Sequence, residues 1–180
     1  MQEEKEFIAE LLNLKTQNQA FQSLIVEYQR PLYNHIRNIV LNHDDADDVL
    51  QNTFIKIFQN LKNFKGESKL FSWMYRIATN EALTFLKQKA KKNGISSEIL
   101  QNKALDNLEA DVFFDGNEIQ VKLQKAIALL PEKQQLIFKM KYFEELKYEQ
   151  ISEILGTSVG GLKASYHIAV KKIEAFVTSN

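Results

Sequence analysis

The chain has 180 residues, 23 acidic and 23 basic side chains, and no cysteine. The lack of cysteine excludes disulfides and thiolate metal sites and fits a reducing compartment, while the zero net charge argues against indiscriminate nucleic-acid binding through a basic surface. No apolar run approaches the length of a membrane span and the acidic N-terminus does not resemble a secretory signal, so we expect a cytoplasmic protein without membrane insertion.

Charge is unevenly distributed along the chain. Residues 66–92 carry six Lys/Arg and two Glu (net +4), residues 95–120 carry one Lys and six Asp/Glu (net −5), and residues 121–180 carry nine Lys and six Glu (net +3). Chance clustering is the alternative, since charge runs are usually solvated faces. We predict two small domains, residues 1–92 and 118–180, joined by an acidic linker over residues 93–117.

Every strong pattern in the chain predicts helix. No segment shows sustained period-two alternation, and there are only two prolines. The first packed element begins at Phe21, and Pro31 is expected in the first turn of a second helix. Asp44 or Asp45 is expected to cap the next helix, whose core-facing stripe is Leu50, Phe54, Ile57 and Leu61.

A loop around Gly66 precedes a basic helix that begins near Leu70. The buried side of this helix is expected to hold Leu70, Met74, Ile77, Ala78 and Phe85, and the outer side Trp73, Arg76, Asn80, Thr84 and Lys87. Trp73 has two interpretations. It is either a ring that stacks on an unpaired base, with the Phe64–Ser68 loop completing a pocket, or an ordinary core aromatic.

The acidic linker shows no convincing period, although Val112–Phe114 is a candidate docking segment. Four short helices follow from about Glu118, and Pro131 starts the second of them. Gly156 is expected to end the third helix and Ser158 to cap the fourth, a helix-turn-helix pattern. The core face of the fourth helix is predicted to be Val159, Leu162, Tyr166, Ala169 and Ile173.

The outer face of that last helix suits duplex DNA. Small and polar residues near its start can approach base edges, Lys171 and Lys172 can reach phosphates, and the outward Ile168 can meet a thymine methyl. A helical hairpin for protein contacts is the alternative.

The acidic cluster Asp44, Asp45, Asp47 and Asp48 favours helix capping, a basic protein partner, or both. The three histidines are scattered, and no paired ligands accompany the cluster. We therefore expect no metal, no cofactor and no small-molecule substrate.

Resemblance to a known family rests on three segments in a fixed order and spacing, which are DDADDVLQNTFIKIF, FSWMYRIATNEAL and ISEILGTSVGGLKASYHIAVKKI. Together they resemble the extracytoplasmic-function (ECF) class of bacterial sigma factors, the promoter-recognition subunits of RNA polymerase, over residues 21–92 and 118–176. The resemblance implies an all-α fold of two small helical domains, the second a four-helix domain with a helix-turn-helix. It also implies a factor without catalysis that directs core RNA polymerase to promoter DNA and initiates melting.

The resemblance implies site residues as well. In the family, the helix matching residues 47–58 binds the polymerase clamp, the next helix and its preceding loop recognise and melt the minus-ten element, and the last helix recognises the minus-thirty-five element. The matching residues are Asp47, Asp48, Gln51 and Phe54 for core polymerase; Phe64, Lys65, Ser68, Trp73, Arg76, Asn80 and Lys87 for the minus-ten element; and Ser158, Gly161, Lys163, Ala164, Ser165, His167, Ile168, Lys171 and Lys172 for the minus-thirty-five element.

The chain departs from the family in its last helix, where Ser165, Ile168 and Val170 stand at places that usually hold arginines. Fewer bidentate contacts to guanine are then possible. We therefore do not assign to this chain any minus-thirty-five sequence known for the family. Many relatives are inhibited by an anti-sigma factor, and we expect one here. Two other classes remain as alternatives, a stand-alone helix-turn-helix regulator that binds duplex DNA as a dimer and a nucleotide hydrolase.

Overall fold

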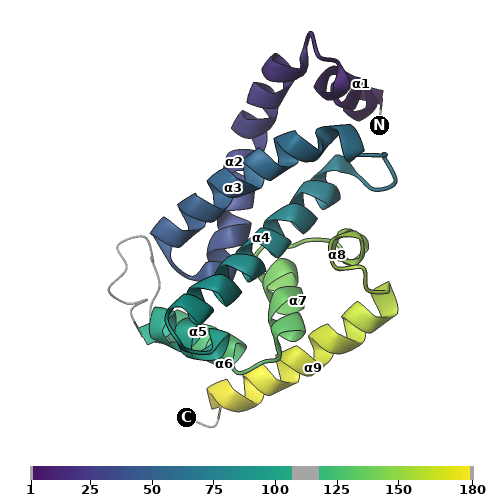
Figure 1. Cartoon of the computed structure of the whole chain (residues 1–180). Coiled ribbons are helices and arrows are strands. Elements are labelled where there is room, and N and C mark those ends of the chain that lie inside the picture. Colours follow the sequence, from purple (N-terminus) through teal and green to yellow (C-terminus); the bar gives the residue numbers. More distant parts are fainter. Residues whose placement is uncertain (1, 107–117, 179–180) are drawn as a thin grey trace.

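The computed structural model describes residues 2–106 and 118–178, and throughout these ranges every regular element is a helix. The expected all-α fold class is confirmed. In chain order the elements (Figure 1) are α1 (Gln2–Leu12), α2 (Gln17–Val40), α3 (His43–Asn60), the short 3-10 helix η1 (Leu61–Asn63), α4 (Leu70–Lys92), α5 (Ser97–Asp106), α6 (Glu118–Ala128), α7 (Glu132–Tyr142), α8 (Tyr148–Leu155) and α9 (Val159–Thr178).

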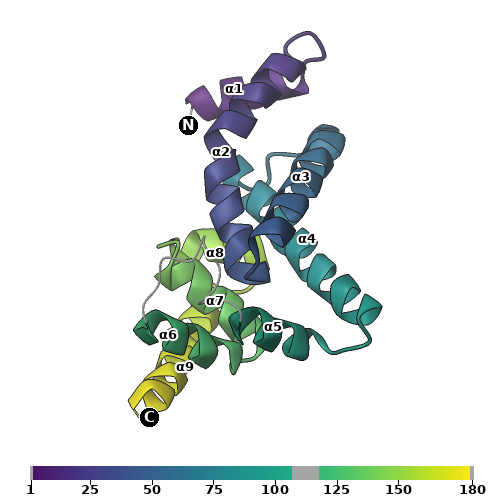
Figure 2. The ribbon, with the colours of Figure 1, turned by 90° about the vertical axis from the view of Figure 1, so that its left-hand side faces the viewer.

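The N-terminal half is a bundle in which α2, α3 and α4 pack on one another. Leu24, Ile36, Ile57 and Met74 are fully buried among these helices. Helix α1 folds back on α2 and buries Leu11, and Figure 2 shows it at the far end of the bundle from α5. The first packed element was expected at Phe21, so α1 was not anticipated.

Pro31 lies inside α2 and does not begin a new helix, so that expectation is wrong. A proline removes one backbone hydrogen bond and normally breaks or kinks a helix. Here Leu24, Leu32 and Ile36 form one fully buried face on both sides of the proline. Burial of that face against α3 and α4 favours one continuous helix over two.

The cap of α3 is Asn42, and neither Asp44 nor Asp45 takes that role. The Asn42 backbone is extended (φ −136°, ψ 139°) and its side-chain oxygen accepts a hydrogen bond from the Asp45 N–H at 2.9 Å. The aspartates already lie within the first helical turn, where a carboxylate interacts favourably with the helix dipole. Asp45 also accepts a hydrogen bond from Lys89 Nζ at 2.6 Å, which ties α3 to α4.

The segment expected to be a linker contains a helix, α5, which packs on α4 and α6. Leu105 is buried against Leu41 at the end of α2. The weak period in the sequence hid this helix because few of its side chains are buried. The candidate docking segment Val112–Phe114 lies outside the described residues.

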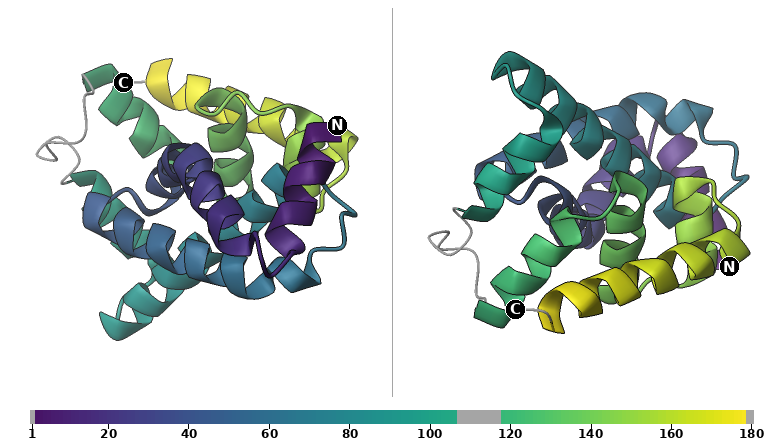
Figure 3. Two further views of the ribbon diagram at one scale, coloured as in Figure 1. Left: turned by 90° about the horizontal axis from the view of Figure 1, so that it is seen from above. Right: turned by 90° about the horizontal axis from the view of Figure 1, so that it is seen from below.

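The C-terminal half is the expected four-helix unit, α6 to α9. Its core includes Ile127, Phe138, Ala169 and Ile173. Gly156 ends α8 in the left-handed conformation (φ 64°) and its N–H donates to the Ser152 carbonyl, as expected for a glycine cap. The Ser158 Oγ accepts from the Gly161 N–H at 3.3 Å at the start of α9. Viewed from below, α9 lies along the outside of this half (Figure 3).

The two halves pack directly on each other. Helix α8 lies beside α4, and α7 reaches α2 (Figure 1). Met140 and Ile151 of the C-terminal half belong to the same buried cluster as Ile36 and Met74 of the N-terminal half. The charge pattern predicted two domains but gave no indication of this interface.

Candidate nucleic-acid interface

One long side of α4 carries the polar side chains expected to face outward. Arg76, Asn80, Thr84 and Lys87 are all exposed there. The opposite side is buried as expected at Leu70, Met74 and Ala78, and partly buried at Ile77 and Phe85.

A third side of α4 is also buried, at Tyr75, Thr79 and Leu86. This side was not anticipated, because α8 packs on α4 and His35 of α2 contacts Thr79, and periodicity within one helix does not reveal burial by other segments. The exposed polar strip is therefore narrower than expected, and Arg76 lies at its border with the C-terminal half.

Trp73 is half-buried. It is therefore neither a fully exposed ring nor a fully buried core aromatic. Its ring centroid is 5.1 Å from that of Phe64, and Phe64 itself is buried at the start of the loop. Lys65 is exposed and Ser68 half-buried in the same loop, which turns at Gly66 with φ +71°. The tryptophan thus packs on one side and leaves part of its ring accessible on the other.

The accessible part of Trp73 borders a cavity of about 280 Å³ between α3, η1 and α4. Of the residues that line this cavity, Asn80 was expected at the minus-ten surface. Lys56 and Glu81 were not expected there, and they form an ion pair at 2.6 Å. The remaining lining residues are Asn60, Asn63 and Ile77. Two asparagines at the end of a helix, just before a glycine loop, are the sequence signal that points to this cavity.

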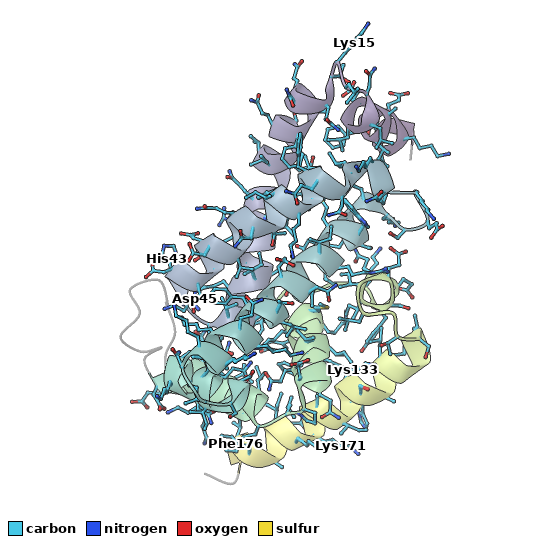
Figure 4. The ribbon with its side chains drawn as sticks, in the orientation of Figure 1. Lys15, His43, Asp45, Lys133, Lys171 and Phe176 are labelled. Atoms are coloured by element: carbon cyan, nitrogen blue, oxygen red, sulfur yellow. The ribbon has the colours of Figure 1, made fainter. Side chains whose placement is uncertain are left out.

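The acidic face of α3 lies on the outside of the N-terminal half. Asp48 and Gln51 are exposed, and Asp47 is half-buried with a carboxylate oxygen 3.5 Å from His43 Nε2. Phe54 is also half-buried, with its ring centroid 6.4 Å from that of Phe21. Figure 4 shows His43 and Asp45 at the start of this helix.

Two further apolar residues continue this face and were not anticipated. Ile55 and Phe58 are exposed at 53% and 39%, one and two helical turns after Gln51. Together with Asp48 they form a mixed acidic and apolar strip, which is typical of a protein-binding surface.

The outer face of α9 carries the residues expected to contact duplex DNA. Lys163, Ala164, His167, Ile168, Lys171 and Lys172 are exposed, and Gly161 and Ser165 are half-buried. Ile168 is 45% exposed, and Figure 4 shows Lys171 on the outer side of the helix. Lys163 Nζ lies 5.7 Å from the centre of the Tyr148 ring, a cation–π contact that orients this lysine.

Comparison with known proteins matches the N-terminal and C-terminal halves of the chain to two separate family models. Residues 24–92 match Sigma-70 region 2, and residues 120–173 match Sigma-70 region 4. An ECF RNA polymerase sigma-E factor of Haemophilus influenzae is 30% identical over 163 residues, which cover 86% of each chain. The chain belongs to the ECF RNA polymerase sigma factors.

Other relatives agree with this assignment. An RNA polymerase sigma-H factor of Pseudomonas aeruginosa is 29% identical over 86% of this chain and 84% of its own length. ECF sigma factor SigW of Bacillus subtilis is 27% identical over 85% of this chain and 86% of its own length. The stand-alone regulator is therefore not favoured.

Solved structures confirm the fold of this sigma factor. CnrH, solved in complex with the cytosolic domain of CnrY, matches over 98% of both chains with a TM-score of 0.73 and 17% identity. The sigma factor RpoE of Bartonella quintana, solved with the anti-sigma factor NepR, matches over 88% of this chain and 96% of its own, with a TM-score of 0.64 and 17% identity.

The sigma factor has one more surface that the sequence did not predict. A mainly apolar groove of about 360 Å³ lies between α6, α7 and α9, lined by side chains that include Leu123, Phe138, Tyr166 and Val170. Across the described ranges, no group of His, Asp and Glu is arranged to hold a metal ion. No helix in the same ranges is long and apolar enough to span a membrane.

Proposed function

We propose that this sigma factor directs core RNA polymerase to promoters and initiates DNA melting, without catalysis of its own and in the cytoplasm. The proposal rests on one observation above all. Two exposed polar faces, on α4 and α9, lie in the segments that match Sigma-70 regions 2 and 4. Residues 1–92 then bind polymerase and the minus-ten element, residues 118–180 bind the minus-thirty-five element, and residues 93–117 connect them.

Polymerase binding is assigned to the outer face of α3. Asp47, Asp48, Gln51 and Phe54 are the residues carried over from the family, and the exposed Ile55 and Phe58 extend that strip. Carboxylates around an apolar centre suit a basic partner surface with apolar anchors.

Recognition and melting of the minus-ten element are assigned to α4 and its preceding loop. The accessible side of Trp73 offers an unpaired base a stacking surface. Asn80 and the asparagines of the adjoining cavity supply hydrogen-bond donors and acceptors. The other residues assigned to the minus-ten element are Arg76 and Lys87 on α4 and Phe64, Lys65 and Ser68 in the loop.

Recognition of the minus-thirty-five element is assigned to α9. In a helix-turn-helix the first half of the second helix approaches base edges in the major groove. Gly161, Lys163, Ala164, Ser165, His167 and Ile168 occupy that half, Ser158 caps it, and Lys171 and Lys172 contact phosphates further along. Only a few cationic side chains are present, so polymerase supplies much of the promoter affinity.

An anti-sigma factor is the proposed regulatory partner. RpoE, of similar fold, was solved with the anti-sigma factor NepR, and CnrH with the cytosolic domain of CnrY. These two solved complexes support a protein inhibitor for this chain as well.

The test is transcription in vitro by core polymerase from the encoding bacterium, on fragments of its genome, with and without the sigma factor. We expect specific transcripts only when the factor is present. Asp48→Lys is expected to abolish them by reversing charge on α3, whereas the same change at the exposed Glu3 of α1 is expected to leave them intact. If no fragment is transcribed in response to the factor, the proposed function is wrong.

A further inference from the structure

The loop assigned to the minus-ten element, residues 64–69 (the minus-ten loop), joins η1 to α4. At its first end the Phe64 N–H donates to the Leu61 carbonyl of η1 at 3.0 Å. At its second end Lys69 has an extended backbone and immediately precedes α4. The positions of the two ends limit the conformations open to a short loop. What holds these ends therefore determines how the loop presents its side chains.

Helix α1 supports the first end of the minus-ten loop. It packs on η1, and Figure 1 shows it next to the end of α3, where η1 begins. Leu11 of α1 and Leu61 of η1 are each 1% exposed, and they belong to the same buried cluster as Phe64. Through this apolar packing α1 fixes η1 and, with it, the Phe64 ring on which Trp73 packs.

Helix α1 also supplies a hydrogen-bond acceptor at the second end of the loop. Lys69 occupies the N-cap position of α4, where Ser, Thr, Asp and Asn are favoured because their side chains accept from free backbone N–H groups. A lysine side chain has no acceptor, and Lys69 forms no side-chain cap. The Glu4 carboxylate of α1 accepts instead from the Leu70 N–H at 3.3 Å. A carboxylate at this place also interacts favourably with the dipole of α4.

Glu4 lies among three helices. It is half-buried on α1 and bonded to the start of α4. Burial, the Glu27 carboxylate and then Glu4 raise the pKa of Tyr28 to about 12, which places Glu4 near α2 as well. Helix α1 precedes residues 24–92, the segment that matches Sigma-70 region 2. The match to that region therefore assigns no role to Glu4.

We propose that α1 positions the minus-ten loop by holding both of its ends, with Glu4 as the positioning residue at the start of α4. Trp73 makes the first backbone hydrogen bond of α4, from its N–H to the Lys69 carbonyl at 3.1 Å. A capped first turn keeps this tryptophan in place before a base arrives, so less conformational freedom is lost on binding. That the loop binds DNA rests on the proposed function, whereas its positioning in the free chain does not.

Fluorescence of the free chain tests the positioning, because Trp73 is the only tryptophan in the sequence. Glu4→Ala removes the acceptor and keeps a good helix former. We expect its emission to shift to longer wavelength and its quenching by acrylamide to increase, because the first turn of α4 loosens. Glu4→Gln keeps an acceptor oxygen and should remain close to the wild type.

The matched control is Glu6→Ala, which removes an exposed carboxylate from the same helix. We expect wild-type emission and quenching from it, and circular dichroism verifies that every variant keeps its helix content. Wild-type quenching in Glu4→Ala would overturn the positioning role. Equal quenching in Glu4→Ala and Glu4→Gln would overturn the hydrogen bond as its cause.

Promoter opening tests what the positioning does. On a promoter identified by the transcription assay, permanganate reactivity measures the ratio of open to closed complexes formed by core polymerase with each variant. We expect Glu4→Ala to lower this ratio about 5-fold, the factor expected for the loss of one helix cap, and Glu4→Gln to restore it. Polymerase affinity, measured by pull-down, should be the same for all variants. A loss of affinity that accounts for the lower ratio would overturn the effect on melting.

The two measurements keep this inference separate from the proposed function. If the wild type opens promoters and Glu4→Ala opens them equally well, the effect on melting is wrong and the sigma-factor function stands. If the wild type opens no promoter, the proposed function fails, while the fluorescence of the free chain still decides whether Glu4 positions the loop.

Discussion

Lys139 provides a direct test of how the C-terminal half is packed. This lysine lies on α7 and is only 4% exposed. Burial lowers its pKa from 10.5 to about 8, an effect that the nearby Glu144 carboxylate partly offsets. At pH 7 the lysine remains charged, so the folded protein contains a buried ammonium that the fold does not favour.

The expected magnitude follows from the pKa. A decrease from 10.5 to about 8 corresponds to about 3 kcal/mol, at about 1.4 kcal/mol per unit. Lys139→Met keeps the volume of the side chain and removes the charge. We expect it to raise the free energy of unfolding at pH 7 by about 3 kcal/mol and the melting temperature by about 6–12 °C.

The lowered pKa of Lys139 also makes the free energy of unfolding depend on pH. Between pH 8 and 10.5 the unfolded lysine binds more protons than the folded one, so the stability of the wild type should rise with pH across this window. Burial raises the pKa of Tyr28 to about 12 and also raises that of Tyr75, so ionisation of these tyrosines in the unfolded chain lowers stability above about pH 10. The free energy of unfolding should therefore be compared at pH 7.5 and pH 9.5.

Urea unfolding at both pH values, followed by circular dichroism, measures the effect. Lys133→Met is the matched control, because Lys133 is an exposed lysine on the same helix (Figure 4). We expect the control to keep both the wild-type stability and its rise with pH, and Lys139→Met to be more stable with a flatter profile. If Lys139→Met is destabilising, or if its pH profile matches that of the wild type, the assignment of a buried, unfavourable ammonium is wrong.

Four further substitutions test the proposed surfaces and one turn. Trp73→Ala should lower promoter opening about 10-fold through lost stacking with polymerase affinity unchanged; permanganate reactivity and pull-down measure the two, and equal losses in both would contradict the assignment. Lys171→Ala should weaken minus-thirty-five DNA binding equally for all sequences and reduce the salt slope by about 1, whereas His167→Ala should change base preference; fluorescence anisotropy of duplexes at several salt concentrations checks this, and a changed preference in Lys171→Ala would count against it. Gly156→Ala forces a side chain into the left-handed region at φ 64° and should cost about 1 kcal/mol of stability, seen as a melting temperature lowered by about 2–4 °C; an unchanged melting temperature would show that the turn relaxes.

Local chemistry explains which elements the sequence predicted well. The turn at Gly156 and Ser158 is specified by a glycine that adopts a positive φ and a hydroxyl that caps α9, and both signals lie within a few residues. Likewise, the core face of α9 follows from its period, with Leu162, Ala169 and Ile173 buried as expected.

The errors arise where distant segments decide local structure. Pro31 lies within a helix because packing of the whole of α2 outweighs one lost hydrogen bond. The buried side of α4 at Tyr75 and Thr79 depends on segments outside this helix, because His35 of α2 contacts Thr79 and α8 packs on α4. Trp73 was assigned to the exposed face by periodicity and is half-buried because the loop places Phe64 beneath it. None of these contacts has a signal within its own helix.

Footprinting of the complete promoter complex tests most directly whether the N-terminal half melts the minus-ten element while the C-terminal half binds duplex DNA at minus thirty-five. Polymerase with this sigma factor is assembled on a promoter identified by the transcription assay, and permanganate and DNase I map unpaired thymines and protected duplex in the same samples. We predict unpaired thymines near minus ten and protected duplex near minus thirty-five, both dependent on the sigma factor. Protected duplex without any unpaired thymines, or melting that persists without the factor, would contradict the central claim.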